Sequence, residues 1–346
     1  MKNIIPFVFL IFVLTSCQKE KITIGTNVSE TFYLDNNGAS MRLLVEGNTS
    51  SHIFLLFVHG GPGSSSYFYN TDYISQNIEN KYAVVYWDQR NAGGSQGNSN
   101  GDHLNLPQMT EDLKKVIQLI KHRYGQDSGI FLLGHSFGGL LTASFMTKDN
   151  NQSMVKGWIF ADGSHNYPLN DTLTRQKLMT VGRQQIALNR NVNSWKTIVD
   201  YCNSHTGNFT FEESLQLTAY AEDAETFFDK VKEINLSTLI DYDPVQYGWP
   251  VTSILFNLSY SSNAGFNRDL AITEFSSKLG KVTTPTLLLY GKYDFTCPGG
   301  LEEDVFNRIN TRDKKIVISP ISGHNIMLQD EVFFCKEVNA FIESHQ

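Results

Sequence analysis

The chain has 346 residues, of which 41% are hydrophobic and 18% charged, and its formal net charge is -7. This apolar content argues against intrinsic disorder, and an acidic balance without a basic stripe argues against a nucleic-acid partner. A chain of this length can bury a large core as one domain with an insertion.

The first residues have the features of a targeting segment. A positive residue precedes the apolar run Ile4–Leu14, which is too short to span a membrane. Leu14–Cys17 (LTSC) resembles a bacterial lipobox, which implies a lipoprotein signal peptide over residues 1–16 and acyl chains on Cys17. Because Gln18 rather than Asp follows, the resemblance implies an anchor in the outer membrane of a Gram-negative-type bacterium. The alternative is an ordinary secretory signal that contains a cysteine.

Two alternating segments follow an expected polar linker over residues 17–29. Glu30–Leu34 and Met41–Glu46 flank the turn sequence Asn36–Gly38, a pattern typical of a β-hairpin. We expect this hairpin to form an antiparallel edge of a larger sheet.

A glycine-rich loop follows the next predicted strand. The apolar segment Ile53–Val58 predicts a buried strand, and it ends in His59–Ser66 (HGGPGSSS). Glycines let backbone N–H groups approach a ligand closely, and in enzymes with a serine elbow this loop supplies half of the oxyanion hole. We assign the two oxyanion donors to the N–H groups of Gly61 and Phe137. The alternative is a plain surface loop.

The following strand, predicted at Tyr82–Trp87, ends in Asp88–Ser95 (DQRNAGGS). A carboxylate and an arginine there can join the loop ends by charge-assisted hydrogen bonds, so we expect this motif to support the structure. From Met109 to Ile120, apolar residues at helical spacing predict a helix that returns the chain to the next parallel strand.

The central motif is a sharp turn between a buried strand and a helix. Ile130–Leu133 predicts the strand, and Gly134–Gly138 (GHSFG) fits the G-x-S-x-G elbow, whose glycines leave room for strained backbone at the serine. Ser136 is therefore the candidate nucleophile. The alternative is an ordinary strand-to-helix turn, because the pattern by itself is short.

The rest of the chain alternates between strands and helices around a helical insertion. The expected elements are strands at Trp158–Ala161, Thr286–Tyr290 and Lys315–Ile318, and helices at Leu301–Ile309 and Val332–Ile342. Residues 165–281 lack clear strands and have helical patterns at Phe211–Lys232 and Thr252–Tyr260. They predict a cap that divides the core into residues 30–164 and 282–346.

Two polar residues lie where the resumed strands end. Asp294 follows Tyr290 and His324 follows Ile318, so both are expected at the same sheet edge as Ser136. The order Ser, Asp, His is that of α/β-hydrolases. We therefore predict an α/β-hydrolase fold, a mostly parallel sheet flanked by helices with an inserted helical cap, and a triad of these three residues. As a general base, His324 must be neutral, so kcat/KM should rise through an apparent pKa within roughly two units of 6.5.

With these segments placed, the chain resembles the proline iminopeptidase branch of the α/β-hydrolases. The matching motifs are His59–Gly63, Asp88–Arg90 with Gly93 and Ser95, the elbow, Gly291–Asp294 with Cys297–Pro298, and Ser322–His324. The resemblance implies release of N-terminal proline or another small residue from peptides. The Trp-Glu pattern with which the family seats a substrate's amino group is absent from the cap. The acidic candidates for that role are Glu222, Asp223, Glu225, Asp241 and Asp243.

The resulting hypothesis is a lipid-anchored serine hydrolase without a cofactor or metal. A carboxylesterase acting on a small ester or amide is the alternative, and a requirement for a free substrate amine separates the two. A non-catalytic binding lipoprotein would be indicated by a broken triad. Epoxide hydrolysis and dehalogenation are disfavoured, because those relatives use Asp where this chain has Ser136. Cys202, Cys297 and Cys335 have no metal-site spacing and are expected to be buried thiols.

Overall fold

The computed structural model describes residues 22–97, 101, 103–234, 260 and 262–346. Its sheet has the strand order β1-β2-β4-β3-β6-β7-β8-β9, with β5 paired to β2. The strands are β1 Val28–Asn36, β2 Ala39–Gly47, β3 Ile53–Val58, β4 Ala83–Trp87, β5 Gln96–Gly97, β6 Gly129–Ser136, β7 Gly157–Gly163, β8 Thr286–Gly291 and β9 Lys314–Ser319. β1 and β2 form the predicted antiparallel hairpin, and the pairs from β4 to β9 are parallel.

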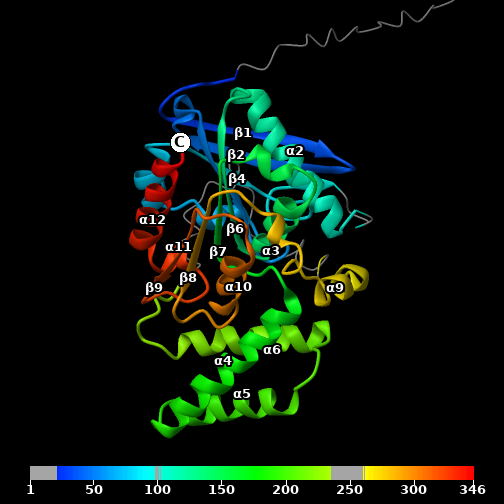
Figure 1. The fold of residues 1–346 in the computed structure, drawn as a ribbon, viewed down its shortest axis with the longest axis vertical. Helices are drawn as coiled ribbons and strands as arrows, with labels where there is room; N and C mark the ends of the chain where they lie inside the picture. Colours follow the sequence, from blue (N-terminus) through cyan, green and yellow to red (C-terminus); the bar gives the residue numbers. More distant parts are fainter. Residues whose placement is uncertain (1–21, 98–100, 102, 235–259, 261) are drawn as a thin grey trace, which may run out of the picture.

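Helices cover both faces of this sheet, and a further group of helices lies at one of its ends (Figure 1). The α-helices are α1 Asp72–Ile74, α2 Leu106–Tyr124, α3 Phe137–Thr147, α4 Tyr167–Ala187, α5 Val192–Ser204, α6 Phe211–Thr226, α9 Ala264–Ala271, α10 Gly300–Arg308, α11 Ile326–Gln329 and α12 Glu331–Ser344. The shorter turns are η1 Thr49–Ser51, η2 Ser66–Tyr69, η3 Ser75–Glu79, η4 Asn151–Met154 and η6 Leu279–Lys281. The predicted fold class, a mostly parallel sheet flanked by helices with an inserted cap, is confirmed.

The central strands are apolar on both faces because each face packs against helices. Along β3, Leu56 faces the cluster formed with α2 and α3, whereas the adjacent Phe57 faces the cluster formed with α11 and α12. The same alternation holds in β6 for Leu132 and Leu133. Successive strand residues point to opposite faces, so a strand buried on both sides has a continuous apolar sequence. This explains why Ile53–Val58 was predicted with the bounds that the structure has.

The cap helices α4, α5 and α6 form a small core of their own. Leu178, Trp195 and Leu217 are fully buried there, and they pack with Phe295 from the loop after β8. The helix predicted at Phe211–Lys232 ends earlier, because α6 stops at Thr226. The aromatic residues that follow leave the helix and pack their rings against the cap core and against the loop after β8.

Several predictions fall outside the described residues. They are the signal peptide over 1–16, the lipidation site Cys17, the acidic residues Asp241 and Asp243, and the predicted helix Thr252–Tyr260 except for Tyr260 itself. In the part of the chain that the structure describes, no helix is both long and apolar enough to cross a membrane. The three cysteines of the described chain are buried free thiols, as expected.

Candidate active site

Ser136 lies at the sharp turn between β6 and α3. Its backbone has φ 54° and ψ -123°, a conformation that is strained for a residue with a side chain. The neighbouring glycines are required by space, because a Cβ on Gly134 would collide with Thr142, and a Cβ on Gly138 would collide with the main chain of Val58. The turn therefore presents the Ser136 side chain at the carboxyl end of β6.

The structure brings Ser136, Asp294 and His324 together at the carboxyl edge of the sheet. The Oγ of Ser136 lies 3.0 Å from Nε2 of His324, and Nδ1 of His324 lies 3.0 Å from Oδ2 of Asp294. The second carboxylate oxygen of Asp294 accepts a hydrogen bond of 2.7 Å from the Cys297 N–H, which fixes the orientation of the fully buried carboxylate. The arrangement links a hydroxyl, an imidazole and a carboxylate in the order that nucleophilic catalysis requires.

The loop after β3 lies directly against Ser136. A Cβ on Gly60 would come within 2.8 Å of the Ser136 Cβ, so only glycine lets this main chain approach. The Gly60 N–H donates to the Tyr69 hydroxyl at 3.3 Å. The Gly61 N–H has no acceptor among the described residues. Phe137 is the first residue of α3, where an N–H has no intrahelical acceptor. Both predicted donors are thus unengaged by the helix and strand ladders.

His135 connects the glycine loop with His324. Its Nε2 lies 2.7 Å from the main-chain oxygen of His324, and its Nδ1 lies 2.8 Å from the Tyr69 hydroxyl. A carbonyl oxygen only accepts, so Nε2 carries the proton and Nδ1 accepts from Tyr69. Burial and the charge of His324 lower the pKa of His135 to about 3, which keeps it neutral. Local sequence gave no indication of this connection, because Tyr69 and His135 are far apart in the chain.

Comparison with known proteins identifies the family. The sequence model described as Serine aminopeptidase, S33 matches residues 49–223. The chain belongs to this family. It is 26% identical over 298 residues to a proline iminopeptidase of Saccharolobus solfataricus, covering 84% of each chain.

Two solved structures share the fold of this S33 hydrolase. A proline iminopeptidase of Mycobacterium smegmatis has a TM-score of 0.65 at 16% identity, covering 91% of this chain and 98% of that chain. An esterase of Exiguobacterium antarcticum has a TM-score of 0.61 at 18% identity, covering 91% and 100%. At these identities the two likenesses establish the α/β-hydrolase fold.

The imidazole of this S33 hydrolase lies among carboxylates. Burial lowers the pKa of His324, but the charges of Asp294, Asp162 and Glu225 and the hydrogen bond with Asp294 together raise it to about 9. Asp162, at the end of β7, is fully buried and accepts two main-chain N–H groups at 2.8 and 2.9 Å. Burial and the nearby Asp294 raise its pKa well above the usual range. Asp162 is not among the predicted site residues, although it directly follows the predicted strand Trp158–Ala161 and so has the same position at a strand end as Asp294.

The raised pKa of His324 predicts a rate that increases with pH beyond neutrality. The neutral imidazole is the form that accepts the Ser136 proton, so kcat/KM should rise as pH increases through the pKa of His324. We expect this apparent pKa to lie above the 6.5 of a free imidazole and toward 9, at the upper end of the range expected from the sequence. A pH profile of kcat/KM from pH 5 to 10 measures it. A profile that is flat from pH 5 to 8 would contradict His324 as the base.

The three described acidic candidates of the cap differ in their surroundings. Glu225 is 8% exposed, and both of its carboxylate oxygens accept the His324 N–H, each at 3.1 Å. Glu222, one turn earlier on α6, is an exposed residue. The protein around its carboxyl group raises the pKa of Glu222 by partial desolvation, and the charge of His324 opposes that rise. Asp223 is exposed, and its main-chain oxygen accepts the Thr226 hydroxyl. Glu225 and Glu222 are therefore near His324.

Asp88 joins the glycine loop to the loop after β4, so the motif supports the structure as predicted, but the arginine beside it is Arg42 of β2, whereas Arg90 pairs with Asp112 of α2. Its Oδ1 accepts the Ser65 hydroxyl at 3.0 Å and the Ser66 N–H and hydroxyl at 2.8 and 2.9 Å. Its Oδ2 accepts the Gly94 N–H at 2.8 Å and lies 3.2 Å from Nε of the buried Arg42. This carboxylate fixes the loop that carries the Gly61 N–H.

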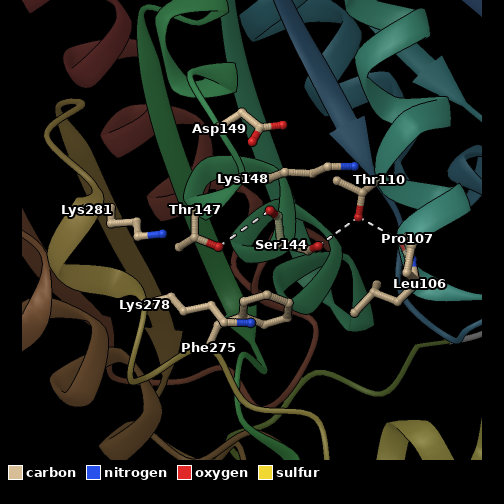
Figure 2. A pocket seen from close by; sticks show the side chains of 10 residues that line it. All are labelled: Leu106, Pro107, Thr110, Ser144, Thr147, Lys148, Asp149, Phe275, Lys278 and Lys281. Atoms are coloured by element: carbon tan, nitrogen blue, oxygen red, sulfur yellow. Dashed lines mark hydrogen bonds between the residues drawn. The ribbon is translucent and has the colours of Figure 1, made fainter.

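A separate pocket of about 410 Å³ is lined by residues of α2, of α3 with the two residues after it, and of the segment 275–281 (Figure 2). Its hydroxyls include those of Thr110 and Ser144, which are 2.7 Å apart. The lysines that line it are Lys148, Lys278 and Lys281. None of the three triad residues lines this pocket, so it is distinct from the candidate active site.

Proposed function

We propose that this S33 hydrolase is a serine hydrolase with Ser136 as nucleophile, His324 as general base and Asp294 as the residue that orients the imidazole. Oγ of Ser136 attacks the substrate carbonyl carbon while Nε2 of His324 takes its proton, and His324 then gives that proton to the leaving amine or alcohol. Water releases the acyl group by the same steps. The single observation that carries the proposal is the pair of 3.0 Å contacts joining the three side chains.

The N–H groups of Gly61 and Phe137 are proposed to bind the negative charge that develops on the substrate oxygen. This assignment is supported by the contact of the preceding Gly60 with Ser136 and by the start of α3 at Phe137. A pair of fixed donors of this kind contributes about 3–4 kcal/mol per donor to the stability of the transition state.

The substrate class that we propose is a peptide with a free N-terminal proline or another small residue. The family description and the proline iminopeptidase of Saccharolobus solfataricus support this choice. We assign the cap to residues 165–281 and the ammonium-binding role to Glu222, because the carboxylate of Glu225 is already engaged by main-chain N–H groups. A substrate ammonium brought into a partly desolvated site requires such a partner.

A carboxylesterase is the second candidate, because the Trp-Glu pattern of the related aminopeptidases is absent from this cap. The two functions predict different responses to a blocked amine. We expect N-acetylation of a prolyl arylamide to lower kcat/KM by at least about tenfold, since losing a charge-assisted hydrogen bond costs roughly 1.5–3 kcal/mol. The measurement compares this arylamide, its N-acetyl form and a short acyl ester of matched size.

Variants of the cap locate the amine-binding group. Glu222→Gln should lower kcat/KM for the free arylamide and leave the ester unchanged, whereas the adjacent Asp223→Asn should affect neither. Equal rates on blocked and free amides, or turnover of the ester alone, would replace the aminopeptidase with the esterase while retaining the triad. An effect of Asp223→Asn in place of Glu222→Gln would move the ammonium site to Asp223.

We also propose that acyl chains on Cys17 anchor the enzyme to the bacterial outer membrane. The lipobox-like sequence Leu14–Cys17 supports this, and several acyl chains together provide stable membrane binding. Cys17→Ser should therefore move the protein from the membrane fraction to the soluble fraction or block its processing. Fractionation with detergent extraction measures the outcome, and a correctly cleaved variant that stays in the membrane would exclude lipidation at Cys17.

A further inference from the structure

Two charged side chains of the cap are bound to the main chain of the loops that carry Asp294 and His324. The first is Lys177 of α4, whose Nζ donates to the carbonyl oxygens of Asp294 at 2.6 Å and Lys292 at 3.0 Å. The same ammonium lies 4.9 Å from the ring centre of Phe295, which packs in the cap core. Lys177 therefore holds the loop after β8 from the cap side.

The second is Glu225 of α6, which holds the loop after β9. Both of its oxygens accept the His324 N–H, and the carboxylate also accepts the Phe295 N–H. It approaches Gly323 so closely that a Cβ at that position would collide with it. One cap carboxylate thus contacts both loops that bring Asp294 and His324 together.

These two side chains differ in charge and share one electrostatic environment. Burial lowers the pKa of Lys177, and the charges of Asp294 and Glu225 oppose that shift. The same two carboxylates raise the pKa of His324. Both side chains belong to the inserted cap, so the charge around the imidazole depends on how the cap is docked. The titratable groups that act directly on His324 come from three strands or strand ends and one helix: Asp162 of β7, Asp294 after β8, His135 of β6, and Glu222 and Glu225 of α6. Two further groups, Lys177 of α4 and Glu302 of α10, interact with the carboxylates of Asp294 and Asp162.

We propose that Lys177 and Glu225 are positioning residues of the catalytic loops, which together fix the main chain at Asp294 and His324 and bias the charge of the imidazole in opposite directions. This inference rests on the proposed role of His324 as general base. The Glu225 carboxylate stabilises the imidazolium, and the Lys177 ammonium opposes it. The cap is then part of the catalytic apparatus in addition to shaping the substrate site.

The opposite signs give a test that a merely structural role would not pass. Removing a negative charge beside the imidazole lowers its pKa, and removing a positive charge raises it. We expect Glu225→Gln to move the acidic limb of the pH profile down by about half a unit or more, and Lys177→Met to move it up by a similar amount. Lys177→Arg should keep the limb close to that of the wild type, because the cation is retained.

The measurement is the second-order rate of inactivation by a fluorophosphonate between pH 5 and 10, on the full chain, with the melting temperature of each variant recorded. Fluorophosphonates react with an activated serine, so no natural substrate is needed. Glu212→Gln and Lys196→Met, exposed changes of the same charge elsewhere on the cap, serve as matched controls. They should leave the limb unchanged.

The proposal would be overturned if the apparent pKa of the acidic limb stayed at the wild-type value in both Glu225→Gln and Lys177→Met, or moved in the same direction in both, whatever the loss of rate. If Glu225→Gln does not fold, the comparison of Lys177→Met with Lys177→Arg still decides, because equal limbs in those two variants would contradict it. Failure of the proposed function has a different signature: a wild-type protein that the fluorophosphonate does not label at Ser136.

Discussion

Replacing either Ser136 or His324 with alanine is expected to lower kcat by several orders of magnitude. Oγ of Ser136 and Nε2 of His324 lie 3.0 Å apart, and the proton passes between these atoms. Groups that act as one unit are not additive, so the Ser136→Ala/His324→Ala double variant should lose little more than either single variant. Steady-state kinetics on an arylamide or ester substrate measures the losses.

The control for this experiment is the folded state of each variant. Both substitutions remove atoms from the sheet edge and leave the strand and helix core intact, so circular dichroism and thermal unfolding should resemble the wild type. Losses in kcat that multiply in the double variant would mean that the two residues act independently, and the assignment of a Ser136–His324 unit would be wrong.

Replacing Asp88 with alanine is expected to lower the free energy of unfolding by about 3–5 kcal/mol. The carboxylate is fully buried beside the Arg42 guanidinium, and removing one partner of a buried pair leaves an uncompensated charge. The change also removes the acceptor of Ser65, Ser66 and Gly94. Urea-induced unfolding, compared with the exposed hairpin residue in Asp35→Ala, measures the difference.

The same variant should lose activity even under conditions where it is folded. Asp88 holds the loop that presents the Gly61 N–H, so a displaced loop is expected to lower kcat more than it changes KM. Asp88→Asn retains an acceptor and should lie between the wild type and Asp88→Ala in stability. A loss of stability for Asp88→Ala no larger than that of Asp35→Ala, within about 0.5 kcal/mol, would show that this carboxylate does not support the loop.

The sequence by itself determined the order and type of the core elements. Strands buried on both faces appear as continuous apolar runs such as Ile53–Val58, and the helices beside them have apolar residues at regular spacing. The glycines of the elbow indicated the strained turn at Ser136, because a side chain at Gly138 would collide with the main chain at the end of β3. Asp294 and His324 could be selected as site residues because each follows a predicted strand, and the carboxyl ends of parallel strands meet at one edge of the sheet. These features depend on neighbours within a few residues of one another.

Tertiary structure decided the surroundings of these residues. Glu225 meets His324 across 99 positions of sequence, and Lys177 meets Asp294 across 117. No local pattern indicates such contacts, because exposed and engaged acidic residues look alike on an amphipathic helix such as α6. Only the docking of the cap distinguishes Glu225 from Asp223. Only the folded chain brings Asp294, Asp162 and Glu225 around His324, where they together raise its pKa to about 9 against the effect of burial. Charges act over distances in space that sequence separation does not measure, so the electrostatics of the site depends on the folded chain.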